Sequence, residues 1–184
     1  MKTLNVAMMA MVLGLVGCAS KQRSADGTTT VILVRHAEKA DEPAADPGLT
    51  PAGATRAKQL IDAVGARQVS TVFTSMYARS VQTAEPLAMK VKAQPEVFDP
   101  RDVAHVQLIT EAVNKHRGET ILIVGHSNTV PELIAALGAP KPAAICEGEY
   151  DGFYVVTIPA SGAASVEAMK YGTETVDASC RTNN

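Results

Sequence analysis

Residues 28–38 read TTTVILVRHAE, and this stretch decides the fold. Residues 28–34 are all aliphatic or β-branched, which is typical of a strand that is buried on both faces of a sheet. Two later runs, VSTVFT at 69–74 and TILIV at 120–124, have the same character. We therefore expect these three segments to be central strands with other elements covering both sides.

Helical patterns lie between and after these strands, at residues 51–64, 77–90, 101–116 and 129–137. The first has Thr50 as a capping residue and Pro51 at its first position, and Gly65 follows it. Strands that alternate with helices predict an α/β fold, with a mostly parallel central sheet flanked by helices on both faces. Two further runs, 153–159 and 165–171, predict an edge hairpin.

The composition fits one globular domain and excludes several classes of function. The chain has 184 residues, of which 46% are hydrophobic, so a single folded domain is expected and wholesale disorder is excluded. A formal net charge of −2 and only 4% aromatic residues predict no nucleic-acid partner. Three Cys without a CxxC pair exclude the usual zinc and iron–sulfur spacings.

Residues 1–17 have the pattern of a signal peptide, in which one lysine precedes an apolar run at 6–16. That run is too short to cross a bilayer as a mature helix. It leads into LVGCAS at 15–20, which resembles the lipobox of bacterial lipoproteins and implies lipidation of Cys18. We therefore expect a membrane anchor through the lipid, a tether at 18–27, and a periplasm-facing location in the bacterial cell envelope.

The folded domain is expected to span residues 28–172, followed by an irregular polar tail at 173–184. Export would place it in an oxidising compartment, where Cys146 and Cys180 could form a disulfide that pins the tail. Two free or buried thiols are the alternative, and the sequence does not decide between them.

Charged side chains follow each central strand where it ends: Arg35 and His36 after the first, Arg79 after the second, and His126 after the third. Ligands of an open parallel sheet bind beyond the carboxyl ends of its strands, so these side chains are expected at one rim. Two guanidiniums can grip phosphate oxygens, while one imidazole attacks phosphorus and the other donates a hydrogen bond. The turn at 125–128, which leads into a helix, adds backbone N–H groups for an anion.

Three motifs resemble those of the histidine phosphatase superfamily, also called the phosphoglycerate mutase-like superfamily. Arg35-His36-Ala37 resembles its Arg-His-Gly signature, TSMYARSVQTA at 74–84 its second-arginine motif, and Gly125-His126-Ser127 its second-histidine motif. The resemblance covers residues 31–137 in order and spacing. It implies a phosphoglycerate mutase-like three-layer sandwich and a metal-independent phosphomonoester hydrolase.

The resemblance also implies a role for each side chain. His36 would be the nucleophile that forms a phosphohistidine, with its other ring N–H held by a backbone carbonyl. Arg35, Arg79 and His126 would bind the substrate phosphate and stabilise charge in the transition state. Neither a metal nor another cofactor is implied, because the guanidiniums supply the positive charge.

Two departures from the family pattern favour a small phosphatase over a mutase. Ala37 stands in place of Gly, and Glu42 stands where mutase-like members carry Asn. The loops at 39–49 and 139–151, which would shape the pocket beyond the phosphate, contain acidic residues that disfavour highly anionic substrates. We expect a small-molecule phosphomonoester as the substrate, and the sequence indicates no particular oligomeric state.

The acid that protonates the leaving group is expected between the second arginine and the second histidine, where the candidates are Glu96, Asp99, Asp102 and Glu111. Asp102 is favoured because it is expected near the start of a helix and close to the rim. Stabilising the helix N-terminus is the alternative role for Asp102. Glu38, which lies close to the nucleophile, is a second candidate.

The remaining polar residues of interest are interpreted as structural. They are His105 and His116, expected at surface positions of the helix, and Glu147, Glu149 and Asp151, expected in a solvated loop. A metal site in that acidic loop is the alternative interpretation.

Two other functions remain open. One is a non-catalytic phosphate-binding lipoprotein, which would keep the pocket but lack a competent acid. The other is a protein phosphohistidine phosphatase, whose partners would normally be cytoplasmic. An envelope location also argues against a glycolytic mutase, because the substrates of such an enzyme are cytosolic.

Overall fold

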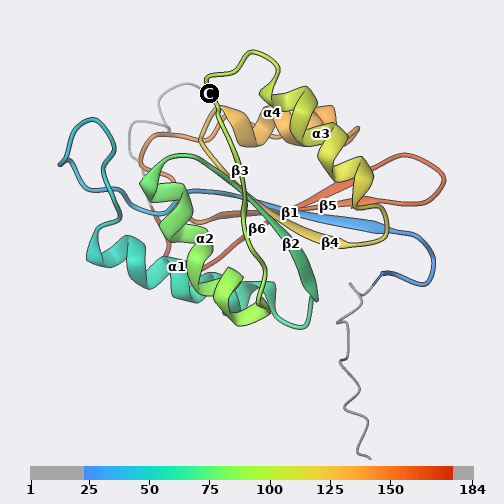
Figure 1. The fold of residues 1–184 in the computed structure, drawn as a ribbon, viewed down its shortest axis with the longest axis horizontal. Helices are drawn as coiled ribbons and strands as arrows, with labels where there is room; N and C mark the ends of the chain where they lie inside the picture. Colours follow the sequence, from blue (N-terminus) through green and yellow to red (C-terminus); the bar gives the residue numbers. More distant parts are fainter. Residues whose placement is uncertain (1–22, 176–184) are drawn as a thin grey trace, which may run out of the picture.

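One six-stranded sheet forms the centre of the computed structural model, which describes residues 23–175 (Figure 1). In chain order, the strands are β1 (Thr29–Arg35), β2 (Val69–Ser75), β3 (Glu96–Phe98), β4 (Thr120–Gly125), β5 (Gly152–Ile158) and β6 (Ser165–Lys170). The helices of this part of the chain are α1 (Pro51–Val64), α2 (Ala78–Val91), α3 (His105–Lys115) and α4 (Thr129–Ala136).

The strand order in the sheet is β3-β2-β4-β1-β5-β6, and β3, β2, β4 and β1 run parallel. β5 pairs antiparallel with β1 and then with β6, so the hairpin expected near the end of the chain is confirmed. The predicted α/β fold with a mostly parallel sheet is confirmed as well.

The sequence did not predict β3. This strand has only three residues, Glu96 and Val97 are exposed, and its one neighbour in the sheet is β2. A strand this short carries no readable periodicity, and its extended conformation follows from pairing with the backbone of β2. β3 also fixes the turn after β2, because the Met76 N–H donates to the Phe98 carbonyl at 2.9 Å.

Alternate residues of the central strands point to opposite faces of the sheet, and each face has its own core. Val31 and Leu33 of β1 belong to the core beneath α3 and α4. Ile32 and Val34 belong to the core beneath α1 and α2. Figure 1 shows the two pairs of helices on opposite sides of the sheet. Burial on both faces explains why the strands are unbroken apolar runs.

α1 begins and ends where the sequence predicts. The Thr50 hydroxyl accepts a hydrogen bond from the Gly53 N–H at 3.1 Å, and Gly65 follows the last turn with a φ of 60°. A Cβ at Gly53 would collide with the backbone carbonyl of Glu38. Glycine at this position therefore lets the loop after β1 lie directly against the start of the helix.

α3 begins at His105, whereas the sequence predicted a start at residue 101. The Asp102 carboxylate accepts a hydrogen bond from the Ala104 N–H at 2.8 Å, and the Asp99 carboxylate accepts one from the Arg101 N–H at 2.9 Å. These local bonds satisfy backbone donors without helix formation. Asp102 therefore precedes the helix rather than lying inside it.

The described chain continues beyond the expected limits of the folded domain. Ser24 and Thr173 both form hydrogen bonds to the domain. The expected signal peptide, the lipidation site Cys18 and the tail residue Cys180 lie outside the described residues. Within residues 23–175, no helix has the length and apolar character needed to cross a membrane.

Candidate active site

The carboxyl ends of neighbouring parallel strands bring the predicted residues together. Arg35 is the last residue of β1 and pairs in register with Gly125, the last residue of β4. His36 and His126 therefore leave adjacent strands at the same edge, and their ring centroids lie 5.2 Å apart. Arg79 lies in the first turn of α2, just beyond β2.

A cavity of about 300 Å³ lies at this edge and is lined by Arg35, His36, Lys39, Tyr77, Arg79, Pro100, Arg101, His126, Ser127, Asn128 and Glu147. The cavity thus contains every side chain that the sequence assigned to catalysis except Asp102. Most of the lining is polar or charged, as expected for a site that binds a hydrophilic ligand.

The backbone fixes the tautomer of His36. Its Nδ1 lies 2.8 Å from the carbonyl oxygen of Ala37. A carbonyl can only accept a hydrogen bond, so Nδ1 carries the proton and Nε2 keeps its lone pair. Burial is the main cause that lowers the pKa of His36 to about 3, and neighbouring His126 and Arg35 act in the same direction. The ring is therefore neutral near pH 7, as a nucleophile requires.

Ala37 connects the nucleophile to the helix that carries Arg79. The Ala37 N–H donates to the Thr83 hydroxyl oxygen at 2.9 Å, and the Thr83 hydroxyl donates to the Arg79 carbonyl at 2.7 Å. Ala37 is completely buried, so the position requires a small side chain. Alanine meets that requirement where the family signature has glycine.

Hydrogen bonds also hold His126 in place. Its backbone N–H donates to the Thr129 hydroxyl at 2.9 Å, and its Nε2 lies 2.8 Å from the Ser75 hydroxyl, which donates to Ser80. The ring nitrogen that remains for a ligand is Nδ1. A Cβ on Gly125 would lie 2.7 Å from the Thr129 hydroxyl, which explains the glycine of the motif. Burial is the first cause that lowers the pKa of His126 to about 4.

Both arginines keep one N–H group for a ligand. Arg35 donates through Nη1 to carbonyls of the loop at 146–149 at 2.6 to 3.2 Å, and its guanidinium lies 4.4 Å from the centre of the Tyr150 ring. Arg79 lies 4.3 Å from the centre of the Tyr77 ring. The Nε atoms of both arginines are buried and have no hydrogen-bond partner among the described residues. Two unsatisfied cationic donors at one cavity make a site for an anion.

The carboxylates expected to supply the acid between the second arginine and the second histidine do not line this cavity. Asp102 lines a neighbouring cavity of about 300 Å³, so its expected position at the rim of the phosphate site is not found. Its carboxylate instead caps the turn before α3. The remaining candidates bind other partners, namely Asp99 with Arg101, Glu96 with His116, and Glu111 with Gln107.

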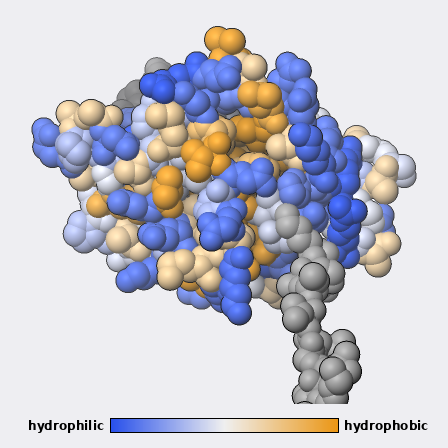
Figure 2. All heavy atoms as spheres, in the orientation of Figure 1, coloured by the Kyte–Doolittle hydropathy of each residue, from blue (hydrophilic) through white to orange (hydrophobic). Residues whose placement is uncertain are grey.

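The cavity that contains Asp102 lies between β3 and α3 and is lined mainly by apolar side chains. Val97, Val103 and Leu108 are exposed nearby, and Figure 2 shows apolar residues gathered over this part of the surface. His105 lines this cavity, and His116 follows the end of α3; both side chains are half-buried, so the expected surface positions hold only in part.

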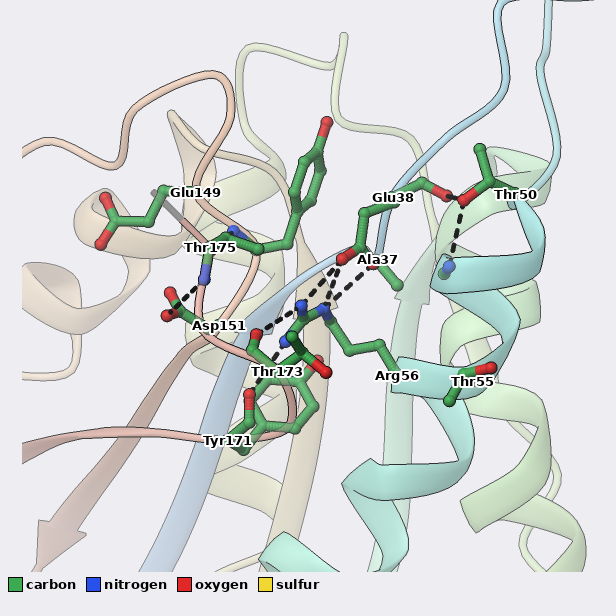
Figure 3. Close-up of polar contacts among 12 residues, drawn as sticks. Ala37, Glu38, Thr50, Thr55, Arg56, Glu149, Asp151, Tyr171, Thr173 and Thr175 are labelled. Carbon is green, nitrogen blue, oxygen red and sulfur yellow. Dashed lines mark hydrogen bonds and ion pairs between the residues drawn. The ribbon is translucent and has the colours of Figure 1, made fainter. Parts of the chain in front are cut away.

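Glu38 forms an ion pair away from the cavity (Figure 3). Its carboxylate accepts hydrogen bonds from Nε and Nη2 of Arg56 at 2.8 to 3.0 Å. Arg56 lies on the buried face of α1 and also donates to the carbonyls of Tyr171 and Thr173, at 2.9 and 2.7 Å. The pair therefore ties the loop that follows His36 to the segment after β6.

The acidic loop before β5 is only partly solvated, in contrast to the expectation from sequence. Asp151 is completely buried, and its carboxylate accepts a hydrogen bond from the Thr175 N–H at 3.1 Å (Figure 3). It accepts a second one from Lys170 at 2.8 Å. Glu149 pairs with the same lysine at 2.7 Å. Glu147 lines the cavity that contains His36 and His126, here called the histidine cavity. Burial and pairing, rather than solvation, thus determine the conformation of this loop.

Cys146 is disulfide-bonded, and its expected partner Cys180 lies outside the described residues. The loop that begins at Cys146 also supplies the carbonyls that bind Arg35. Among the described residues, no group of three or more His, Cys, Asp or Glu side chains is arranged to hold a metal.

Sequence reasoning expected the loops that contain Lys39, Glu147 and Tyr150 to shape the pocket, but it assigned none of these three residues to the site individually. Lys39 follows the Arg-His motif by three residues, and this proximity in sequence could have indicated that it lies at the site. Glu147 and Tyr150 lie in the long irregular segment between α4 and β5. No local sequence pattern indicates that this segment contacts Arg35. The Tyr150 ring lies 6.1 Å from the ring of His36.

The fold and the cavity define an α/β domain with an anion-directed site of histidines and arginines. Residues 31–101 match the family model of the histidine phosphatase superfamily (branch 1). The matched segment includes the motifs around His36 and Arg79. No curated protein sequence matches the chain.

Solved phosphatases share the fold at low sequence identity. The protein histidine phosphatase SixA, complexed with tungstate, has a TM-score of 0.61 and 18% identity over 77% of this chain and 96% of that chain. A mycobacterial glucosyl-3-phosphoglycerate phosphatase has a TM-score of 0.59 and 15% identity over 80% and 100%. Phosphoserine phosphatase from Entamoeba histolytica has a TM-score of 0.55 and 14% identity over 79% and 97%. These likenesses show the shared fold.

Replacing Glu38 should destabilise the domain without removing the cavity. Glu38→Gln leaves the buried guanidinium of Arg56 without its counter-charge, and we expect the free energy of unfolding to fall by about 2–4 kcal/mol. Urea unfolding followed by circular dichroism measures this change. Glu167→Gln, an exposed change on β6, serves as the control and should shift the value by less than about 0.5 kcal/mol. Equal stability of the two variants would contradict the structural role of Glu38.

His36 and His126 should stay neutral in the native protein as the pH falls from 8 to 5, because their pKa values are about 3 and about 4. NMR titration of the ring signals, assigned with single alanine variants, measures this. In the unfolded chain a histidine takes up a proton near pH 6.5. The unfolded state therefore binds more protons below that pH, and the free energy of unfolding should fall as the pH drops from about 6.5 toward 3. An inflection near pH 6.5 in either native signal would show the expectation to be wrong.

Proposed function

We propose that the protein hydrolyses small phosphomonoesters through a phosphohistidine on His36, without a metal or other cofactor. One observation carries the proposal: the guanidiniums of Arg35 and Arg79 belong to residues that line the same cavity as His36, whose Nε2 keeps its lone pair. A phosphoryl group held by both guanidiniums would satisfy them and present its phosphorus to the nucleophile. The superfamily match supports the same chemistry.

In the first step, Nε2 of His36 attacks phosphorus and the bond to the leaving oxygen breaks. Arg35 and Arg79 contact the phosphoryl oxygens and stabilise the charge that builds on them. His126 joins them through Nδ1 when that nitrogen takes up a proton from the bound phosphate. The His36 ring becomes cationic, and its hydrogen bond to the Ala37 carbonyl stabilises that charge. In the second step, water attacks the phosphohistidine, which releases phosphate and restores the neutral ring.

A protein phosphohistidine phosphatase is the alternative that one comparison favours, because SixA is a protein histidine phosphatase. Such a substrate would present a P–N bond to the same cavity. A phosphate-binding protein without catalysis is the other alternative, since the anion site by itself accounts for binding. Turnover separates this last function from the other two.

The purified chain should hydrolyse p-nitrophenyl phosphate in the presence of EDTA, measured as release of p-nitrophenolate. His36→Ala should reduce kcat by at least about 10³-fold, because it removes the nucleophile. The same variant should still bind inorganic phosphate, since both guanidiniums remain, and calorimetry provides this control. Phosphate binding by the unmodified protein with no turnover of p-nitrophenyl phosphate or a phosphohistidine protein would favour the binding function instead.

We also propose that lipid on Cys18 anchors the domain in the bacterial cell envelope, where it faces the periplasm. The support is the sequence of residues 1–20, in which an apolar run leads directly to the cysteine. Cys18→Ala should move the protein out of the membrane fraction of a bacterial host or leave it unprocessed, because the thiol that carries the lipid is absent. Cell fractionation and mass spectrometry measure this. Unmodified protein that is entirely soluble would contradict the anchor.

A further inference from the structure

Glu147 is the one carboxylate among the described residues that lines the histidine cavity. It lies in the loop between α4 and β5, far along the chain from the other residues of the site. Its Oε1 lies 3.1 Å from Nη2 of Arg35, and its backbone carbonyl accepts a hydrogen bond from Nη1 of Arg35 at 2.7 Å. The peptide backbone is thus fixed at the site, whereas the side chain itself is 75% exposed and has room to move.

The other carboxylates near the site are committed to partners. Glu38 binds the buried guanidinium of Arg56, and Asp102 caps the turn before α3. Asp46 accepts a hydrogen bond from the Ala78 N–H at the start of α2. Each of them holds part of the backbone in position. Among the carboxylates of residues 23–175, only that of Glu147 belongs to a residue that lines this cavity, where it contacts Arg35.

The Glu147 carboxylate binds Arg35 directly beside the place where we expect the substrate phosphate to bind. A substrate phosphate that binds the guanidinium of Arg35 comes to lie next to this carboxylate. Two neighbouring negative groups repel each other, and a proton on one of them removes the repulsion. Substrate binding therefore places the phosphoryl group beside the carboxyl group of Glu147.

We propose that Glu147 is the proton donor to the leaving group, an inference that rests on the proposed phosphomonoesterase function. As Nε2 of His36 forms its bond to phosphorus, the P–O bond breaks and its electron pair goes to the ester oxygen. The carboxyl proton of Glu147 passes to that oxygen, and an alcohol leaves. In the second step the Glu147 carboxylate takes a proton from water, the water oxygen bonds to phosphorus, and the P–N electron pair returns to Nε2.

A purely structural role for Glu147, which would be to hold Arg35 in place, predicts a different result from proton donation. An alkoxide leaves poorly without a proton, whereas p-nitrophenolate leaves readily without one. Loss of a proton donor therefore slows alkyl phosphates selectively, and loss of an Arg35 contact slows every substrate alike. kcat/KM is the right quantity, because it reports formation of the phosphohistidine and not its hydrolysis.

The experiment compares glycerol 2-phosphate with p-nitrophenyl phosphate in Glu147→Gln and the unmodified chain. Glu147→Gln should lower kcat/KM for glycerol 2-phosphate about 10²-fold and for p-nitrophenyl phosphate less than about 3-fold. Glu147→Asp should recover part of the activity toward glycerol 2-phosphate. Glu167→Gln, the same change at an exposed site on β6, should leave both values unchanged.

Equal losses on both substrates, or no loss on either, would overturn the assignment of Glu147 and leave the phosphatase function standing. Absence of turnover by the unmodified chain on both substrates would overturn the proposed function itself. Circular dichroism and urea unfolding confirm that each variant is folded before its activity is compared.

Discussion

The parallel pairing of β1 with β4 is the constraint on which the rest of the site depends. It sets Arg35 opposite Gly125 in register, so the residues that follow both strands emerge side by side at one edge. A slip of one residue would turn the alternating apolar side chains of β1 from one core to the other. Packing of the two cores fixes this register, which places the ring centroids of His36 and His126 5.2 Å apart. The position of the site therefore follows from hydrophobic burial.

The domain buries positive charge at this edge without placing a buried carboxylate beside it. Arg35 is only 3% exposed, and backbone carbonyls and the face of Tyr150 surround its guanidinium. Nη1 of Arg35 donates to those carbonyls, Nη2 pairs with the exposed carboxylate of Glu147, and Nε has no partner among the described residues. Burial and the neighbouring positive charges lower the pKa values of His36 and His126, so the site combines an attraction for anions with a neutral imidazole that can attack one. Binding and nucleophilicity therefore have one physical origin.

Much of the fold and the centre of the site could be predicted from sequence because both depend on local pattern. The segments 28–34, 69–74 and 120–124 consist mainly of aliphatic and β-branched residues, and such runs become strands covered on both sides. Thr50, Pro51 and Gly65 mark the ends of α1 through backbone chemistry alone. Parallel strands place their carboxyl ends at one edge, so a residue that follows a strand is assigned to the site without knowledge of any contact.

Tertiary structure decided the features that depend on contacts between distant residues. β3 is a strand only because β2 pairs with it, and α3 starts late because Asp102 caps the preceding turn. Glu38 lies close to the nucleophile in sequence, yet its carboxylate binds Arg56, which also donates to a carbonyl of the segment after β6. Glu147 enters the cavity through contacts with Arg35 across the whole domain. The sequence by itself determined the strands and the residues at their ends, whereas the direction of each charged side chain depended on which distant partner packing brought within hydrogen-bond reach.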